Sequence, residues 1–227
     1  MTSNPDRMAA IRASYDAVAG SYAEAMSDEL RHKPLDRALL TCFAEQVAGT
    51  EQVAGAGRGG AGRVWDVGCG PGQVTAFLTG LGVKAAGLDL SDAMIAHARK
   101  RHPGLEFSTG SMTALPAADG SHAGLVSFYS LIHLVDDADL RLALAEFRRV
   151  LAGDGLLLVA VHTGQEIRHS TEWFGAEVDI SFRFFDPDWL SAELEQAGFA
   201  IESLTRRQPY PQVEVPTERA YFLARAR

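Results

Sequence analysis

The sequence predicts an α/β fold organised around a mostly parallel β-sheet. From Arg63 onward, short apolar segments of strand length alternate with segments of helical periodicity, which is typical of consecutive βαβ units. A glycine-dense turn, Gly68–Gly72, joins the first strand to a helix, and the second strand ends near Asp89. Because open α/β sheets bind ligands beyond the carboxyl ends of their strands, this turn and acid predict a site for a nucleoside cofactor.

Each element of the core has its own signal. Five apolar segments have the length and composition of buried parallel strands. They are Arg63–Val67, Lys84–Leu88, Leu105–Ser108, Gly124–Phe128 and Leu156–Val161. Helices with one apolar face, the second capped by Ser91, are expected at Gln73–Leu81, Ser91–Arg101 and Asp137–Leu151. A last helix begins at Asp186 and Pro187 and ends at Gly198, and Ile201–Arg206 and Arg219–Ala226 close the sheet.

Two segments lie outside this alternation. Residues 1–48 are expected to form an N-terminal helical lid. Residues 49–62 are expected to form a flexible joint to the core at 63–227, because the Glu-Gln-Val-Ala-Gly of residues 45–49 is repeated at 51–55 and a Gly-rich stretch follows. Within that core, residues 162–185 form an insertion. Its apolar residues alternate with polar ones from Val178 to Phe184, which predicts one extra edge strand that covers the substrate.

The spacing of the glycines restricts the type of cofactor. A dinucleotide fingerprint needs a third glycine where this chain has Gln73, and Pro71 removes a backbone N–H from the turn. Asp66 at the end of the strand would repel a diphosphate, whereas it would suit a ligand that carries an ammonium and a sulfonium. Asp89 is placed to accept hydrogen bonds from a ribose diol.

These motifs resemble those of a known family. Asp66–Gly72 and Gly87–Ser91 are similar to the first two motifs of the class I S-adenosylmethionine-dependent methyltransferases. Phe128–Leu134 and Arg149–Leu158 resemble the family's fourth and fifth strand segments, and Tyr15–Tyr22 resembles the lid helix of its small-molecule, ubiquinone/menaquinone-type branch. The resemblance implies a Rossmann-like, seven-stranded, mostly parallel sheet with an antiparallel last strand and flanking helices.

The resemblance also implies S-adenosylmethionine as cofactor and S-adenosylhomocysteine as product. The methionine carboxylate is expected against the N–H groups of the glycine turn, and the adenine between apolar side chains. Ser111 stands where the family usually has an acid, which is a departure from the pattern. The predicted cofactor contacts are Tyr15, Tyr22, Asp66, Gly68, Gly70, Gly72, Asp89, Leu90, Met94, Ser111, Met112 and Phe128.

Two histidines are the candidate catalytic residues. Methyl transfer needs mainly positioning, and a base only when the acceptor must lose a proton. His133 follows the fourth strand and His162 ends the fifth, so both are expected to face one crevice and to titrate near an ordinary pKa of about 6.5. No metal is expected, because the acids from Asp136 to Asp139 have the position of a helix start.

Composition argues against several classes of protein. The net charge of −8 disfavours nucleic-acid binding. There is no apolar run long enough for a membrane span and no signal-peptide pattern, which predicts a cytoplasmic monomer or homodimer without membrane contact. The favoured function is methyl transfer to a small molecule, with oxygen expected ahead of nitrogen or carbon. A protein or peptide methyltransferase and a cofactor-binding protein that does not methylate are the alternatives.

Overall fold

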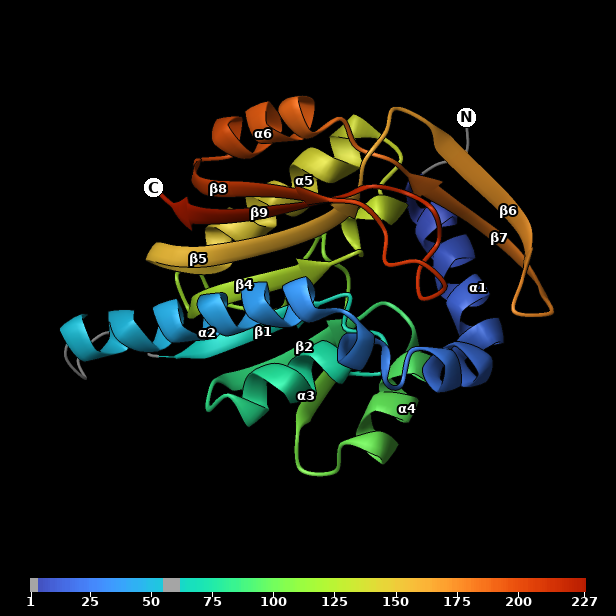
Figure 1. Ribbon diagram of the computed structural model, residues 1–227, viewed down its shortest axis with the longest axis horizontal. Helices are drawn as coiled ribbons and strands as arrows, with labels where there is room; N and C mark the ends of the chain where they lie inside the picture. Colours follow the sequence, from blue (N-terminus) through green and yellow to red (C-terminus); the bar gives the residue numbers. More distant parts are fainter. Residues whose placement is uncertain (1–3, 55–61) are drawn as a thin grey trace.

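Seven strands form the central sheet of the computed structural model, which describes residues 4–54 and 62–227 (Figure 1). Their order is β3-β2-β1-β4-β5-β9-β8, and only β9 runs antiparallel to the others. The strands are β1 (Arg63–Val67), β2 (Lys84–Asp89), β3 (Glu106–Thr109), β4 (His122–Phe128), β5 (Leu151–His162), β8 (Phe199–Arg207) and β9 (Arg219–Ala226). The predicted sheet, including its antiparallel last strand, is therefore confirmed.

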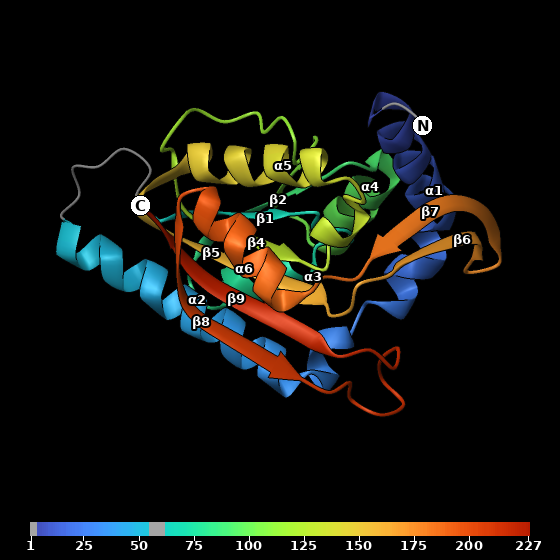
Figure 2. The same cartoon turned by 90° about the horizontal axis from the view of Figure 1, so that it is seen from above.

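Helices cover both faces of this sheet (Figure 2). The described helices are α1 (Asn4–Ala25), α2 (Pro34–Ala54), α3 (Gln73–Gly80), α4 (Asp92–Arg101), α5 (Asp137–Val150) and α6 (Pro187–Gln196), with 3-10 turns η1 (Glu29–His32) and η2 (Leu131–His133). The apolar faces of α2 and α3 pack on one side of the sheet, and those of α5 and α6 on the other. None of the described helices is long and apolar enough to cross a membrane.

Strand β5 shows how the sequence builds this double core. Leu156 and Leu158 belong to the cluster that α2 and α3 complete, whereas Leu157, Val159 and Val161 belong to the cluster under α5 and α6. Successive side chains of a strand point to opposite faces, so a continuous apolar run is what a strand covered on both sides requires. The side chains of these five residues are all nearly inaccessible to solvent.

The insertion at 162–185 differs from the prediction. It forms two strands, β6 (Ile167–Trp173) and β7 (Ala176–Arg183), which pair antiparallel in a separate sheet instead of adding one strand to the main edge. Phe174 and Gly175 connect them, and both have a positive φ, as a tight hairpin turn requires. Only β7 was predicted, because β6 is largely exposed and its sequence has no apolar alternation.

The N-terminal region also divides differently from the predicted lid. Only α1 lies over the carboxyl ends of the strands, beside the β6–β7 hairpin (Figure 1). Helix α2 is part of the core, because Leu40, Phe43 and Val47 pack against the sheet. It also continues through residues 49–54, the first part of the predicted joint, whereas residues 55–61 of that joint lie outside the described residues.

Candidate active site

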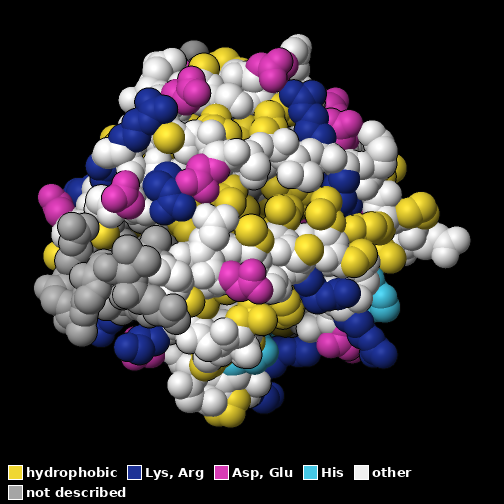
Figure 3. Space-filling view, turned by 60° about the vertical axis from the view of Figure 1, so that its left-hand side comes forward, with side chains coloured by type: hydrophobic (Ala, Val, Ile, Leu, Met, Phe, Trp, Pro, Cys, Tyr) yellow, Lys and Arg dark blue, Asp and Glu magenta, His cyan; other side chains and the backbone are white. Residues whose placement is uncertain are grey.

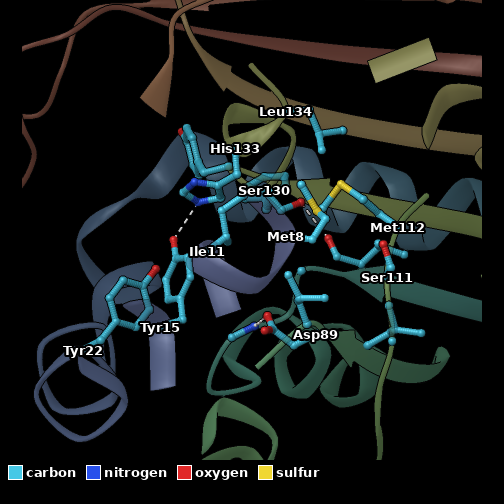
Figure 4. Close-up of a pocket in the computed structure, with 18 residues that line it drawn as sticks. Met8, Ile11, Tyr15, Tyr22, Asp89, Ser111, Met112, Ser130, His133 and Leu134 are labelled. Atoms are coloured by element: carbon cyan, nitrogen blue, oxygen red, sulfur yellow. Dashed lines mark hydrogen bonds between the residues drawn. The ribbon is translucent and has the colours of Figure 1, made fainter. Parts of the chain in front are cut away.

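A pocket opens where β1, β2 and β4 end, beneath α1 (Figure 4). It holds about 680 Å³ of space that no protein atom fills, part of it continuous with solvent. Segments far apart in the sequence line it: the turn after β1, the end of β2, the loop after β3, the end of β4 and one face of α1. Ten predicted residues meet here: Tyr15, Tyr22, Gly68, Gly70, Asp89, Leu90, Ser111, Met112, Phe128 and His133.

The glycine turn is held against β2, and at Gly68 it has no room for a side chain. The N–H of Gly68 donates to the carbonyl oxygen of Leu88 over 2.7 Å. A Cβ at Gly68 would lie 2.2 Å from the Cβ of Ser130, and the residue has a φ of +77°. Gly72 also has a positive φ, but its Cα faces the ring of Phe107 and it does not line the pocket. The turn therefore presents bare backbone to a ligand at Gly68 and Gly70.

Asp89 reaches from the end of β2 to the glycine turn. Its Oδ2 accepts the N–H of Gly70 over 2.8 Å, and its Oδ1 accepts the N–H of Ser91 over 2.9 Å. Burial raises the pKa of this carboxyl, and these backbone donors oppose that rise. Each carboxylate oxygen can accept a further hydrogen bond, so the fixed carboxylate fits a ligand with two adjacent hydroxyl groups.

The far wall of the pocket is mainly apolar. Leu90 and Met112 line it, and Ser111 turns its hydroxyl toward Thr113, with 2.8 Å between the two hydroxyl oxygens. Met94, predicted beside the adenine, is instead fully buried on the inner face of α4, because the helix turns this position toward the core. The wall offers a flat apolar surface with one weakly polar edge.

Asp66 also lies away from the pocket. Its Oδ2 accepts a hydrogen bond from the Thr75 hydroxyl over 2.6 Å, and only 1% of the residue is exposed. Burial raises its pKa to about 7, against which the Thr75 hydrogen bonds act. The predicted contact with a cationic ligand is therefore corrected: this acid joins β1 to α3.

His133 stands at the pocket wall with both ring nitrogens engaged. Its Nε2 lies 2.7 Å from the hydroxyl oxygen of Tyr15, and its Nδ1 lies 3.2 Å from the carbonyl oxygen of Ser181 in β7. Burial lowers its pKa to about 4, although the Ser181 carbonyl favours the charged form. The imidazole is thus neutral at pH 7, and the expected titration near 6.5 is corrected.

His162 does not share this pocket. Its Nδ1 lies 2.8 Å from the hydroxyl oxygen of Thr217, and its ring packs 5.1 Å from that of Tyr129, which itself lines the pocket. Burial lowers its pKa to about 3, and the charges of Arg219 and Lys33 act in the same direction. The two histidines therefore do not face one crevice, because Tyr129 occupies the pocket side of His162.

Helix α1 covers the pocket, and the hairpin packs behind the two tyrosines that α1 turns toward it. The ring of Trp173 in β6 lies 5.6 Å from that of Tyr15 and 5.4 Å from that of Tyr22. The hydroxyl of Ser14 accepts the N–H of Asp179 in β7 over 2.9 Å. The aromatic side chains of both elements thus form one continuous cover.

Sequence reasoning missed several lining residues. Met8 and Ile11 extend the face of α1 that carries Tyr15, and their helical spacing from it is the signal that could have found them. Tyr129 and Ser130 follow β4 and gave no such signal. Tyr129 has a φ of +55°, an uncommon conformation for a residue with a side chain.

The groups that line the pocket suit a nucleoside with a positively charged substituent. Bare backbone, a fixed carboxylate and an apolar wall meet in one pocket, and its lining includes no Lys or Arg. Asp89 is the only acid among these lining residues. In the described parts of the chain, no cluster of three His, Cys, Asp or Glu side chains could hold a metal ion.

Comparison with known proteins extends this result. Residues 64–155 match the family model described as a methyltransferase domain. The demethylmenaquinone methyltransferase of Beutenbergia cavernae is 35% identical over 98 residues, which cover 43% of this chain and 40% of that protein. A protein of Mycolicibacterium smegmatis, named as a probable S-adenosylmethionine-dependent methyltransferase, is 32% identical over 142 residues, 61% of this chain and 52% of that protein. The chain spans about half the length of the first relatives it matches.

Solved structures share the fold at low sequence identity. The 1,6-didemethyltoxoflavin-N1-methyltransferase of Burkholderia thailandensis gives a TM-score of 0.72 at 18% identity, over 100% of this chain and 91% of that one. An S-adenosylmethionine-dependent methyltransferase of Methanosarcina mazei gives a TM-score of 0.65 at 19% identity, over 72% of this chain and 92% of that one. Residues 64–155 therefore match a methyltransferase domain, and the chain is similar to S-adenosylmethionine-dependent methyltransferases in sequence and in fold.

Proposed function

We propose that the chain transfers a methyl group from S-adenosylmethionine to a small-molecule acceptor and releases S-adenosylhomocysteine. The observation that carries this proposal is one pocket that contains the turn at Gly68 and Gly70, the carboxylate of Asp89 and the neutral base His133. When bound, S-adenosylmethionine supplies a methyl group on a positively charged sulfur. A pocket lined by one carboxylate and by no Lys or Arg suits that charge.

Some residues of the pocket would bind the cofactor, and others would position the acceptor. The N–H groups of Gly68 and Gly70 already donate to Leu88 and Asp89, so the backbone of this turn would lie against the methionine part of the cofactor without holding its carboxylate. Asp89 would accept hydrogen bonds from the ribose hydroxyls. Leu90 and Met112 would flank the adenine, and Phe128 and Tyr22 would contact the part of the cofactor near the acceptor. His133 would accept the acceptor's proton. Positioning of this kind can lower a barrier by about 7–11 kcal/mol.

The cover supports a small acceptor in preference to a protein side chain. Helix α1 and the hairpin close over the pocket with packed aromatic side chains. On the face in Figure 3, Lys and Arg side chains are interspersed with Asp and Glu and form no continuous basic surface. With the net charge of −8, this supports an enzyme that acts without nucleic acid. We further propose that it works in the cytoplasm, as a monomer or homodimer, without membrane contact.

The acceptor class follows from the neutral histidine and the apolar wall. A phenol or a hydroquinone must lose a proton as it is methylated, so oxygen is the favoured acceptor atom. The relatives named as demethylmenaquinone methyltransferases support a quinone-type ring as the first class to test.

Calorimetry with S-adenosylhomocysteine tests the cofactor site. Asp89→Ala should weaken binding by about 1.5–3 kcal/mol, roughly tenfold to a hundredfold, because the ribose hydroxyls lose their charged acceptor. Asp188→Ala, whose carboxylate is 88% exposed on α6, should bind as the parent does. Absence of binding by the parent protein would refute the proposed function, whereas equal affinity of Asp89→Ala and parent would refute only the role of Asp89.

A radiolabelled methyl donor tests the acceptor. The purified protein is incubated with S-adenosylmethionine and, separately, 1,4-dihydroxynaphthalene, 4-nitrophenol, aniline and a lysine-containing peptide. We expect label in the hydroxylated rings. Label in the peptide alone would favour the protein-methylating alternative.

A further inference from the structure

The Tyr15 hydroxyl and the His133 imidazole form a pair at the pocket wall (Figure 4). The tyrosine comes from α1 and the histidine from η2, and both side chains line the pocket. The 2.7 Å between Tyr15 Oη and His133 Nε2 is a short, direct hydrogen bond. The basic nitrogen of His133 is therefore already engaged by a tyrosine that itself faces the ligand space.

The direction of this hydrogen bond follows from the other side of the ring. The Ser181 carbonyl oxygen can only accept a hydrogen bond, so the proton of the neutral imidazole resides on Nδ1. Because burial keeps His133 neutral, its Nε2 carries a lone pair and no hydrogen. The hydroxyl of Tyr15 must then donate its own hydrogen to Nε2.

We propose that Tyr15 is the catalytic residue that takes the acceptor's proton, and that His133 acts through it as the final proton acceptor. This rests on the proposed function. As the acceptor's oxygen forms its bond to the methyl group, its O–H bond breaks and the proton passes to Tyr15 Oη. The hydroxyl hydrogen of Tyr15 passes at the same time to His133 Nε2. One positive charge leaves with the donated methyl group and one appears on the imidazole, so the net charge of the pocket is unchanged.

The surroundings of Tyr15 favour a relay over a stored phenolate. Desolvation raises the pKa of its hydroxyl well above the ordinary value, and Tyr22 and Asp89 add to the rise. A phenolate would therefore not accumulate, and the hydroxyl can only pass on a proton as it receives one. The ring is held edge-on by Tyr22 at 5.7 Å and by Trp173 at 5.6 Å, which keeps the hydroxyl directed at His133.

Ser181 gives the hairpin a role in this pair. Its backbone carbonyl, in β7, selects the tautomer whose Nε2 can receive the proton. The carbonyl is therefore a positioning group that acts through His133. The element that covers the acceptor thus also sets the direction of proton transfer.

Nitrogen NMR of histidine-labelled protein tests the direction of the hydrogen bond without any acceptor. We expect His133 as the Nδ1–H tautomer at pH 7, both in the parent and in Tyr15→Phe, with a change in the Nε2 shift when the phenol hydroxyl is removed. An Nε2–H tautomer in the parent would overturn the proposal, because His133 would then donate to Tyr15.

Affinity for S-adenosylhomocysteine distinguishes a role of Tyr15 in proton transfer from the predicted contact of Tyr15 with the cofactor. Tyr15→Phe should bind S-adenosylhomocysteine within about twofold of the parent, since the hydroxyl is committed to His133. A tenfold loss would assign the hydroxyl to the cofactor and overturn the relay. Failure of the parent to bind S-adenosylhomocysteine would refute the proposed function and leave the tautomer measurement to decide the pair.

Kinetics then test the relay with the hydroxylated ring that the acceptor experiment identifies. Tyr15→Phe and His133→Gln should each lower kcat by about 10²–10⁴-fold, the range of a positioned base, and the double variant should be no slower than either. His169→Gln, half exposed on β6 and bonded to the Ser181 hydroxyl, is the matched control and should keep the parental kcat. A Tyr15→Phe variant that keeps more than about a third of kcat would overturn the proposal.

Discussion

Ser130 occupies the space that a Cβ at position 68 would need, and its hydroxyl donates to the carbonyl oxygen of Val67 over 2.7 Å. Two strand ends, those of β1 and β4, are thereby joined directly beside the pocket. The glycine at position 68 is needed for two separate reasons, its positive φ and the close approach of Ser130. Gly82, which has a positive φ but no close neighbour, allows the two effects on stability to be measured separately.

Gly68→Ala and Gly82→Ala should differ by the contact with Ser130. Both glycines have a positive φ, but nothing lies within 4 Å of a Cβ at Gly82. Alanine in the left-handed region costs about 1–2 kcal/mol, and overpacking adds about 1–3 kcal/mol only at position 68. Urea denaturation of both variants gives the difference. Equal losses of stability would show that the 2.2 Å approach relaxes freely.

Single residues of the site were predicted where the local chain alone sets their position. Asp89 and Gly70 are such cases, since a strand–turn–helix unit brings its own end and turn together. The structure places His162 and Asp66 outside the pocket, because the side that a strand residue faces depends on register and on what packs against it. Met8 shares a helical face with Tyr15, and this spacing is a local signal that could have located it.

At the scale of elements, α1 is attached to the start of α4 by polar contacts. The Asp16 carboxylate accepts the Ser91 hydroxyl over 2.5 Å and the N–H of Ala93 over 3.2 Å, at the start of α4. Arg12 pairs with Asp92 on the same helix. Ser91 also donates its N–H to Asp89, so the attachment of α1 is continuous with the predicted ribose site.

Asp16→Ala should loosen α1 over the pocket. Trypsin is expected to cleave after Arg12 faster in this variant than in the parent, and S-adenosylhomocysteine should slow cleavage in both, as expected of a cover that excludes water. Asp28→Ala, exposed and without a side-chain cap hydrogen bond, is the control. If cleavage of the parent is equally fast with and without the ligand, α1 is not a ligand-responsive cover.

The elements of the main sheet were predicted to within a few residues, because buried apolar runs and capping residues are local signals. Ser91 caps α4 as expected, its hydroxyl accepting the N–H of Met94. The hairpin was half missed, since β6 is exposed and pairs only with β7 among the described strands. An exposed strand such as β6 needs no apolar alternation, so its sequence carries no local pattern that would predict it.

At the scale of the whole molecule, buried histidines make stability depend on pH. Burial lowers the pKa of His122 and His133 to about 4 and that of His162 to about 3. Between about pH 4 and 6.5 the unfolded chain therefore binds more protons than the native protein at these sites, so their contribution to stability falls as pH falls. Asp66, with its pKa raised to about 7, acts in the opposite direction.

Urea denaturation should accordingly show a net loss of stability from pH 7 to pH 4.5. The three buried histidines lower stability over this range, and their effect outweighs that of the buried acid, which raises it. His122→Phe should keep the stacking on Trp65, whose ring lies 4.5 Å away, and should show a shallower slope by at most one proton. One proton corresponds to about 1.4 kcal/mol per pH unit. A slope identical to that of the parent would mean that His122 takes up protons equally in the native and unfolded states, and would refute its lowered pKa.

The hairpin shares no ladder with the main sheet among the described residues, and the isolated bridge between Thr163 and Phe185 joins the two ends of the insertion to each other. Its register is set by its own turn, so insertions, deletions or exchanges within it leave the pairing of the seven main strands unchanged. Selection can therefore alter the hairpin that packs behind Tyr15 and Tyr22 while it retains the sheet and its glycine turn. A lineage built on this chain can diversify its chemistry by exchanging one short, separable segment.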